Sequence, residues 1–259
     1  RGHTLKSQID LECLVQHAAD EILIGIKQAT GVTAAHLHEP LIDQRDINEV
    51  AGCLELGFVS SAGTLTDSFE RSISRYTGAH HVVGVVNGTA ALHLMLLASG
   101  VSANNEVLIP ALTFVATANA VLYCGATPHF VDSSPEDLGI DVAELRKYLE
   151  QISEIRNGKC MNKSTGKIIS HIIPVHVFGS IGNIQSLLEL AREFRLTVIE
   201  DSTEALGSRR DGIHAGLFGL CGALSFNGNK IITTGGGGAV LTNDDEIGGK
   251  IRTLATTAK

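Results

Sequence analysis

The chain has 259 residues, of which 44% are hydrophobic and 19% charged, and it carries a formal net charge of −8. This composition is typical of a folded, soluble protein with a full core, and it excludes an intrinsically disordered chain. The negative charge argues against nucleic acid or an anionic membrane as the main partner, because both bind basic surfaces. A small anion in a local basic pocket remains compatible with it.

Residues 1–45 predict an N-terminal helical segment. Within residues 8–29, apolar side chains recur mostly three or four positions apart, which is the spacing of an amphipathic helix. These residues are Ile9, Leu11, Leu14, Val15, Ala18, Ile22 and Ile26. A polar connection with His36 and His38 follows. An HxH pair can bind a metal, but no cysteine or third histidine nearby supports this, so we interpret both as surface histidines.

Residues 46–259 predict a larger α/β domain. From about residue 80, short β-rich runs such as "HVVGVV", "EVLIPA" and "LTVIED" alternate with helical stretches such as "IQSLLELAREF". This alternation predicts a mostly parallel sheet with helices on both faces. Residues 156–167, "RNGKCMNKSTGK", are polar and basic and predict an exposed loop. The final "IRTLATTAK" reads as a helix without a stop signal, so we expect the chain to belong to a longer protein.

The chain contains five cysteines and no CxxC pair. An odd number of cysteines without such a motif predicts reduced, mostly buried thiols, as in a cytoplasmic protein. No apolar run reaches the length of a membrane span.

Three strand-to-helix or strand-to-loop junctions could carry chemistry, and the first is "VVNGTAALHLML" (85–96). Gly88 permits a tight turn between a strand and an apolar helix. The Thr89 hydroxyl and the N–H groups at the helix start would form a site for a phosphate. The alternative is a plain junction in which Thr89 caps the helix.

The second junction, "LTVIEDSTEALG" (196–207), places Glu200 and Asp201 at the carboxyl end of an apolar strand. Ligands bind at this edge of open α/β sheets. A carboxylate there can hold a protonated ring nitrogen, although it can equally serve as a helix cap.

The third junction is "SFNGNKIITTGGGG" (225–238). It is no Walker phosphate loop, because the glycines follow Lys230 and Ile231 stands where that motif requires Ser or Thr. A lysine beside a buried strand is easily desolvated, and a neutral amine is a nucleophile for carbonyls. The alternative is a solvated loop lysine. A carbonyl cofactor with a phosphate and a basic ring nitrogen, pyridoxal 5'-phosphate (PLP), would need all three junctions.

With these motifs in this order, the chain resembles the DegT/StrS-type PLP-dependent sugar aminotransferases of fold type I. The resemblance covers most of the chain and includes "PALTFVATANAVLYCGATPHFVD", "IIPVHVFG", "VIEDSTEALGS" and "SFNGNKIITTGGGGAVLTND". Within the family it is most similar to the branch that aminates UDP-linked 4-keto-6-deoxy amino sugars in legionaminic acid pathways. The resemblance implies a PLP-binding large domain, with the family's C-terminal small domain absent from these residues.

The resemblance also implies roles for individual residues. Lys230 matches the lysine that binds PLP covalently and moves protons, and Asp201 matches the acid on the pyridinium nitrogen. The phosphate cradle matches Gly88, Thr89, the Ala90 N–H and Ser225.

Three further positions come from the same resemblance. Phe114 matches the aromatic residue that stacks on the cofactor ring. Glu204 stands where many members have Gln near the ring hydroxyl, and a second carboxylate there would repel Asp201 or take up a proton. Asn227 stands where some members carry His.

The implied reaction transfers an amino group from an amino acid, L-glutamate by resemblance, to a nucleotide-linked 4-keto-6-deoxy sugar for a surface glycan. A cytoplasmic homodimer with shared active sites is expected. Another fold type I PLP enzyme, such as a lyase or desulfurase, and a non-catalytic PLP or sugar-nucleotide sensor are the alternatives. Gly235–Gly238 are expected to form a tight turn before the strand "GAVLTN".

Overall fold

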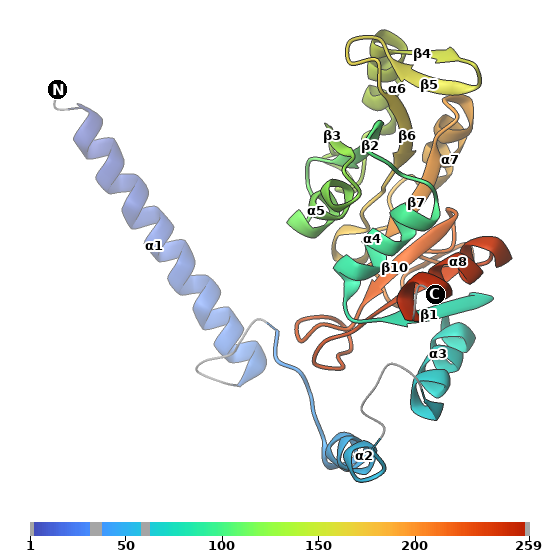
Figure 1. Cartoon of the computed structure of the whole chain (residues 1–259). Helices are drawn as coiled ribbons and strands as arrows, with labels where there is room; N and C mark the ends of the chain where they lie inside the picture. Colours follow the sequence, from blue (N-terminus) through green and yellow to red (C-terminus); the bar gives the residue numbers. More distant parts are fainter. Residues whose placement is uncertain (1–2, 32–37, 58–62, 257–259) are drawn as a thin grey trace. The chain divides into compact units, whose positions relative to one another are not determined.

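The computed structural model describes residues 3–31, 38–57 and 63–256, with side chains from residue 13 onward. The chain divides into two compact units, residues 1–39 and 40–259. The first contains α1 (His3–Thr30), which confirms the predicted helix and extends it toward the N-terminus (Figure 1). His36 lies outside the described residues, and His38 is exposed. Among the described residues, no group of three potential ligands could hold a metal ion.

The second unit contains the remaining elements. Its helices are α2 (Gln44–Glu55), α3 (Thr64–Thr77), α4 (Gly88–Ala98), α5 (Val115–Tyr123), α6 (Val142–Ile152), η1 (Val177–Gly179), α7 (Ile184–Glu193) and α8 (Asp245–Thr256). Its strands are β1 (His81–Val85), β2 (Asn105–Pro110), β3 (Thr127–Val131), β4 (Ser153–Arg156), β5 (Lys159–Asn162), β6 (Ile168–Ile172), β7 (Thr197–Asp201), β8 (Arg209–Arg210), β9 (Ile213–His214), β10 (Cys221–Ser225) and β11 (Gly238–Thr242).

A nine-stranded sheet forms the centre of this unit, and its main path runs β1-β11-β10-β7-β6-β2-β3. Every neighbouring pair from β10 to β3 is parallel, whereas β11 runs antiparallel to both β1 and β10. The predicted mostly parallel sheet is therefore confirmed. The carboxyl ends of β10, β7, β6 and β2 meet at one edge of the sheet, where ligands bind in open α/β folds.

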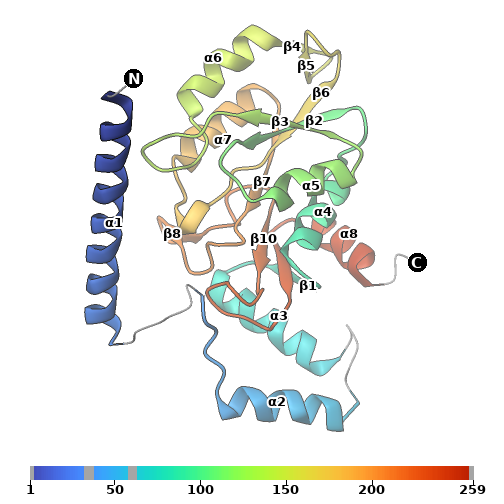
Figure 2. The same ribbon diagram turned by 90° about the vertical axis from the view of Figure 1, so that its left-hand side faces the viewer.

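Side chains alternate between the two faces of the sheet, and each face has its own core. On β2, Val107 and Ile109 belong to the cluster formed with α4, α5 and α8, whereas Leu108 belongs to the cluster formed with α6 and α7. The two sets of helices accordingly cover opposite faces (Figure 2). Strands buried on both sides explain why the runs in the sequence are continuously apolar.

The prediction of an exposed loop over residues 156–167 is correct in exposure for most of the segment but wrong in its secondary structure. Strands β4 and β5 form an antiparallel hairpin there, and β5 pairs with β6. Asn157 and Gly158 both have positive φ, 52° and 74°, as a two-residue hairpin turn requires. Cys160 is fully buried beneath the hairpin. Polar composition concealed a strand whose inward positions are Cys160 and Asn162.

All five cysteines are free. Cys160 and Cys221 are buried, Cys53 and Cys124 are half-buried, and Cys13 is exposed. Within the part of the chain that the structure describes, no helix has the length and apolar character needed to cross a bilayer.

Candidate active site

The Asp201 carboxylate lies at the carboxyl end of β7, with 3% of the residue exposed. Thr117 Oγ1 of α5 donates to Asp201 Oδ2 at 2.6 Å. The Oδ1 atom accepts from the N–H and the hydroxyl of Thr203, at 3.2 and 2.8 Å. These three hydrogen bonds fix the orientation of the carboxylate.

Glu200, the preceding residue, lies on the other face of β7 and is completely buried. Its Oε2 accepts from the Gly216 N–H and contacts Nε2 of buried His176, both at 2.8 Å. Its Oε1 accepts from the N–H groups of Phe218 and Gly219, both at 2.7 Å. Glu200 therefore holds the loop between β9 and β10 against the sheet, and of the two predicted acids only Asp201 lies in the candidate site.

Lys230 lies in the loop that follows β10. Because β10 and β7 are parallel neighbours, with Ala223 opposite Asp201, this loop emerges at the edge that carries Asp201. The Lys230 N–H donates to the Asn227 carbonyl at 3.0 Å, which closes a turn. The Lys230 side chain is 16% exposed and lies 3.1 Å from Glu204 Oε1 through its Nζ atom. The lysine is largely buried rather than solvated, as the functional interpretation requires.

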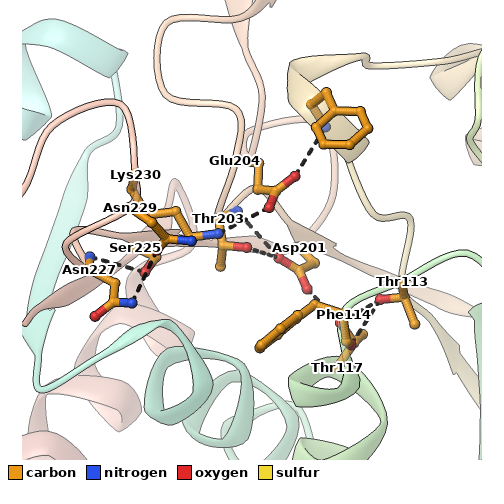
Figure 3. A network of polar contacts seen from close by, with 11 residues as sticks. Thr113, Phe114, Thr117, Asp201, Thr203, Glu204, Ser225, Asn227, Asn229 and Lys230 are labelled. Atoms are coloured by element: carbon orange, nitrogen blue, oxygen red, sulfur yellow. Dashed lines mark hydrogen bonds and ion pairs between the residues drawn. The ribbon is translucent and has the colours of Figure 1, made fainter. Parts of the chain in front are cut away.

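Glu204 connects Lys230 to a further segment. Its Oε2 accepts a hydrogen bond from the Phe178 N–H at 3.2 Å, in η1 after β6. Phe178 has φ 51° and is 85% exposed. Figure 3 shows the contacts that join Thr113, Thr117, Asp201 and Thr203 together with the separate contact between Glu204 and Lys230.

The predicted phosphate cradle lies where α4 begins. Gly88 is packed so closely that an added Cβ would lie 2.9 Å from Thr203 Cγ2 and 3.0 Å from Ser225 Cβ. Ser225 is buried and its Oγ accepts from the Asn227 N–H at 3.4 Å. The residue Gly88 thus brings the helix N-terminus directly beside Ser225.

The cap of α4 differs from the expected one. Asn87, not Thr89, caps the helix, and its Oδ1 accepts from the Ala90 N–H at 2.8 Å. The N–H expected to bind a phosphate is therefore engaged with Asn87. A phosphate that uses it must displace the Asn87 side chain, which is exposed and can rotate away.

Phe114 directly precedes α5 and is 72% exposed. Figure 3 shows its ring extending from the start of α5 toward the Asp201 part of the network. Thr113 and Thr117 are hydrogen-bonded at 2.8 Å, which fixes this helix start beside β7.

The glycine run forms a turn into β11. Gly235 has φ 79°. An added Cβ at Gly237 would lie 2.4 Å from Thr234 Oγ1, and one at Gly238 would lie 2.5 Å from the Asn87 carbonyl carbon. Gly235 and Gly236 have room for a Cβ, with no atom closer than 4.0 Å, although the positive φ of Gly235 still favours glycine. The expected tight turn is confirmed, and its glycines let the chain pass close to the start of α4.

Thr117, Thr203 and Phe178 escaped the sequence prediction. All three lie within motifs that the sequence singled out, but their hydrogen bonds reach other segments. A threonine one helical turn after Phe114 was the available signal for Thr117, and a threonine two residues after Asp201 for Thr203.

Comparison with protein-family models matches residues 40–258 to the DegT/DnrJ/EryC1/StrS aminotransferase family. The chain belongs to this family. The DegT/DnrJ/EryC1/StrS aminotransferases are PLP-dependent, and the chain has the large-domain architecture of PLP fold type I.

Among characterised relatives, the chain is 39% identical to GDP-perosamine synthase of Caulobacter vibrioides over 83% of the chain and 54% of that protein. It is 34% identical to a UDP-4-amino-4-deoxy-L-arabinose–oxoglutarate aminotransferase of Shewanella sediminis over 84% of the chain and 52% of that protein. The PLP form of the putative sugar aminotransferase Spr1654 from Streptococcus pneumoniae superposes with TM-score 0.71 and 25% identity, over 85% of the chain and 57% of that structure. The chain spans about half the length of the relatives it matches.

The residues at the sheet edge fit the family's cofactor. An amine, an oriented carboxylate and a hydroxyl beside a helix N-terminus are the donor set that PLP requires. Gly88 leaves no space for a side chain at the point where the helix meets Ser225, so the helix start can present its backbone to a phosphate once the Asn87 side chain releases the Ala90 N–H.

Proposed function

We propose that the protein is a PLP-dependent aminotransferase that moves an amino group from L-glutamate to a nucleotide-linked 4-keto-6-deoxy sugar in surface-glycan biosynthesis. The convergence of the Lys230 amine and the Asp201 carboxylate at the carboxyl edge of the sheet carries this proposal. The relatives named for perosamine and amino-arabinose products support the sugar acceptor, and the oxoglutarate in one name supports glutamate as donor. We assign the acceptor to the legionaminic acid branch because the motif sequences of this chain are most similar to those of that branch.

When bound, PLP supplies a carbonyl that forms a covalent bond with amines and a ring that accepts electron density. Asp201 would hold the ring nitrogen protonated, and Thr117 and Thr203 keep its carboxylate oriented. Ser225 and the start of α4, with Gly88, Thr89 and Ala90, would hold the phosphate. Phe114 would cover one face of the ring, and Glu204 and Asn227 would line the space around Lys230.

Lys230 has two roles in this proposal. Its amine would bind the cofactor covalently, and after an amino substrate displaces it, the free amine would remove and return protons as a general base and acid. The turn closed by the Asn227 carbonyl fixes the backbone position from which the Lys230 side chain reaches the site.

We propose that the protein works as a homodimer whose second subunit covers the site. Large apolar side chains around the edge are exposed in the single chain: Val86 73%, Phe114 72%, Phe178 85% and Ile231 63%. Exposed apolar residues gathered at one place are typical of an interface. Sedimentation of the full-length protein should show a dimer, and Ile231→Asp should weaken it, with Ile155→Asp on the β4–β5 hairpin as the control. The free cysteines favour the cytoplasm as the place of the reaction.

The test uses the full-length protein with PLP. We expect a visible absorption band that borohydride removes, with the reduced cofactor on Lys230 by mass spectrometry. L-Glutamate should bleach the band, and a 4-keto sugar nucleotide should restore it. Lys230→Arg should abolish the band, whereas Lys250→Arg should keep it. A protein without the band is no enzyme of this class, and a band that glutamate leaves unchanged contradicts the transaminase assignment.

A further inference from the structure

Glu204 is the residue that the sequence left without a role, because a second carboxylate near Asp201 should repel it. The structure removes this conflict. Asp201 takes its hydrogen bonds from Thr117 and Thr203, whereas Glu204 points to Lys230 and to the Phe178 N–H. These hydrogen bonds come from different donors, and the Lys230 charge lies beside Glu204.

Resting on the proposed function, we propose that Glu204 is a positioning residue that holds the Lys230 amine in the site whenever this amine is free and protonated. The observation that carries the proposal is the ion pair of 3.1 Å between Lys230 Nζ and Glu204 Oε1, with the lysine 16% exposed. The Glu204 side chain is 38% exposed, so water screens this pair in part, although less than it screens an ion pair between two fully exposed side chains.

The other oxygen of Glu204 explains why the carboxylate stays in place. Oε2 accepts from the Phe178 N–H, and that residue lies in a turn with φ 51° followed by Gly179 at φ 84°. An added Cβ at Gly179 would lie 2.8 Å from Ser208 Oγ and 3.5 Å from the Glu204 carbonyl oxygen, so the turn packs closely on the segment that carries Glu204. When Lys230 Nζ moves away from Oε1, Oε2 keeps its hydrogen bond to the Phe178 N–H.

This arrangement suits a lysine that alternates between bound and free. When an amino substrate displaces Lys230, the released amine can take up a proton and return to Oε1, which keeps Nζ within reach of the reacting atoms. Without a partner, the long lysine side chain gains rotamer freedom and can leave the site. Glu204 thus acts on the reaction through Lys230.

The proposal makes a charge-specific prediction. Glu204→Gln is isosteric and keeps an oxygen for the Phe178 N–H, but it no longer stabilises the ammonium form of Lys230. Glu204→Ala loses both contacts. The Lys230 amine should therefore react faster in both variants, whereas protection of the Phe178 amide from hydrogen exchange should decrease only in Glu204→Ala.

The main experiment needs no PLP. Full-length protein, stripped of PLP with hydroxylamine, is labelled with trace acetic anhydride between pH 6 and 10, and mass spectrometry reads the labelling of Lys230 and Lys250. In Glu204→Gln we expect Lys230 to be labelled about 3- to 10-fold faster at pH 8, because Nζ loses its ion-pair partner. Lys250 should keep its wild-type rate, which also reports that the variant is folded.

The matched control is Glu246→Gln. Glu246 pairs with Lys250 at 2.7 Å on the surface of α8. Because both side chains are exposed, this change should alter Lys250 labelling by less than about twofold and leave Lys230 unchanged. Lys230 labelling within twofold of wild type in both Glu204 variants at every pH overturns the proposal.

The outcome is separable from that of the proposed function. If the wild type forms no adduct with PLP but its Lys230 labelling depends on Glu204, the enzyme assignment fails and the ion-pair role stands. If the adduct forms but Glu204→Gln leaves the labelling profile unchanged, the enzyme assignment stands and the role of Glu204 fails.

Discussion

Glu200 and Asp201 are neighbours on one strand, but their carboxylates lie in opposite surroundings. Glu200 is enclosed by backbone N–H groups and His176 on one face, and it holds a loop against the sheet. Asp201 is held by two threonines on the other face, at the edge that also carries Lys230. Alternation along the strand separates a carboxylate that stabilises the fold from one that is available for chemistry.

The largest expected effect is the loss of turnover when Asp201 is replaced, which replacement of Glu200 should not cause. Asp201→Asn should reduce transaminase turnover of the full-length protein about 10³-fold, because an amide cannot hold a ring nitrogen in its protonated form. The free energy of unfolding should change little, since Asn keeps an oxygen for Thr203. Turnover with L-glutamate and a keto sugar, with urea unfolding, measures both. Near-normal turnover would show that Asp201 has no role in the chemistry.

The complementary change is Glu200→Gln. Both oxygens of Glu200 accept from backbone N–H groups, so the amide nitrogen of Gln must face a donor in either orientation. We expect the free energy of unfolding to fall by about 3 kcal/mol. Turnover per folded molecule should remain close to wild type. Urea unfolding measures the loss of stability, with the exposed Glu189→Gln as the control. If Glu200→Gln and Glu189→Gln were equally stable, Glu200 would not have the structural role that distinguishes it from Asp201.

Two buried histidines extend the comparison of buried polar groups, because one of them makes the stability of the fold depend on pH. His176 is paired with Glu200, whereas Nδ1 of His171 contacts the Ser170 hydroxyl. Burial lowers the pKa of His171 to about 4 from 6.5, with the Ser99 backbone offsetting part of this effect. The unfolded chain therefore binds a proton that the folded chain does not, and His171 lowers stability as the pH falls from about 6.5 to about 4.

The measurement compares urea unfolding at pH 7.5 and pH 5. At pH 5 the destabilisation from His171 should reach about 2 kcal/mol. His171→Gln should remove this pH-dependent part, whatever its effect at pH 7.5. Exposed His38→Gln serves as the control. The same loss between the two pH values in wild type and His171→Gln would show that this histidine does not titrate in this way.

The smallest expected effect concerns the orientation of Asp201. Thr117→Val removes the hydroxyl that donates to Asp201 Oδ2 and keeps the shape of the buried side chain. Turnover should fall about tenfold, which corresponds to the loss of one hydrogen bond to a charged group. Thr253→Val on α8, where the exposed hydroxyl donates to the local helix carbonyl of Gly249, is the matched control. An unchanged turnover in Thr117→Val would assign the orientation of Asp201 to Thr203 alone.

Much of this fold could be predicted because its signals are local. Continuous apolar runs alternating with helical patterns indicate strands buried on both faces, and the sheet confirms them. The β4–β5 hairpin was missed although "NG" at residues 157–158 is a turn signal, because lysines and polar residues on its exposed positions concealed the alternation.

The site could be predicted only in part. Lys230, Asp201 and Ser225 follow the ends of strands, and parallel neighbours bring such ends together. The partners could not be predicted in the same way, since Thr117 lies 84 residues from Asp201 and Phe178 lies 26 residues from Glu204. Hydrogen bonds over such separations depend on how helices pack on the sheet, which local patterns do not encode.

By itself, the sequence determined the α/β architecture, the position of the glycine turn and the order of motifs that identifies the family, because periodicity and backbone freedom are properties of short segments. Only the tertiary structure decided which of Glu200 and Asp201 belongs to the site and which to the fold, and that Glu204 forms an ion pair with Lys230. The physical reason is that ion pairs and hydrogen bonds act over a few ångströms, so the role of a charged group depends on the atoms that folding places beside it.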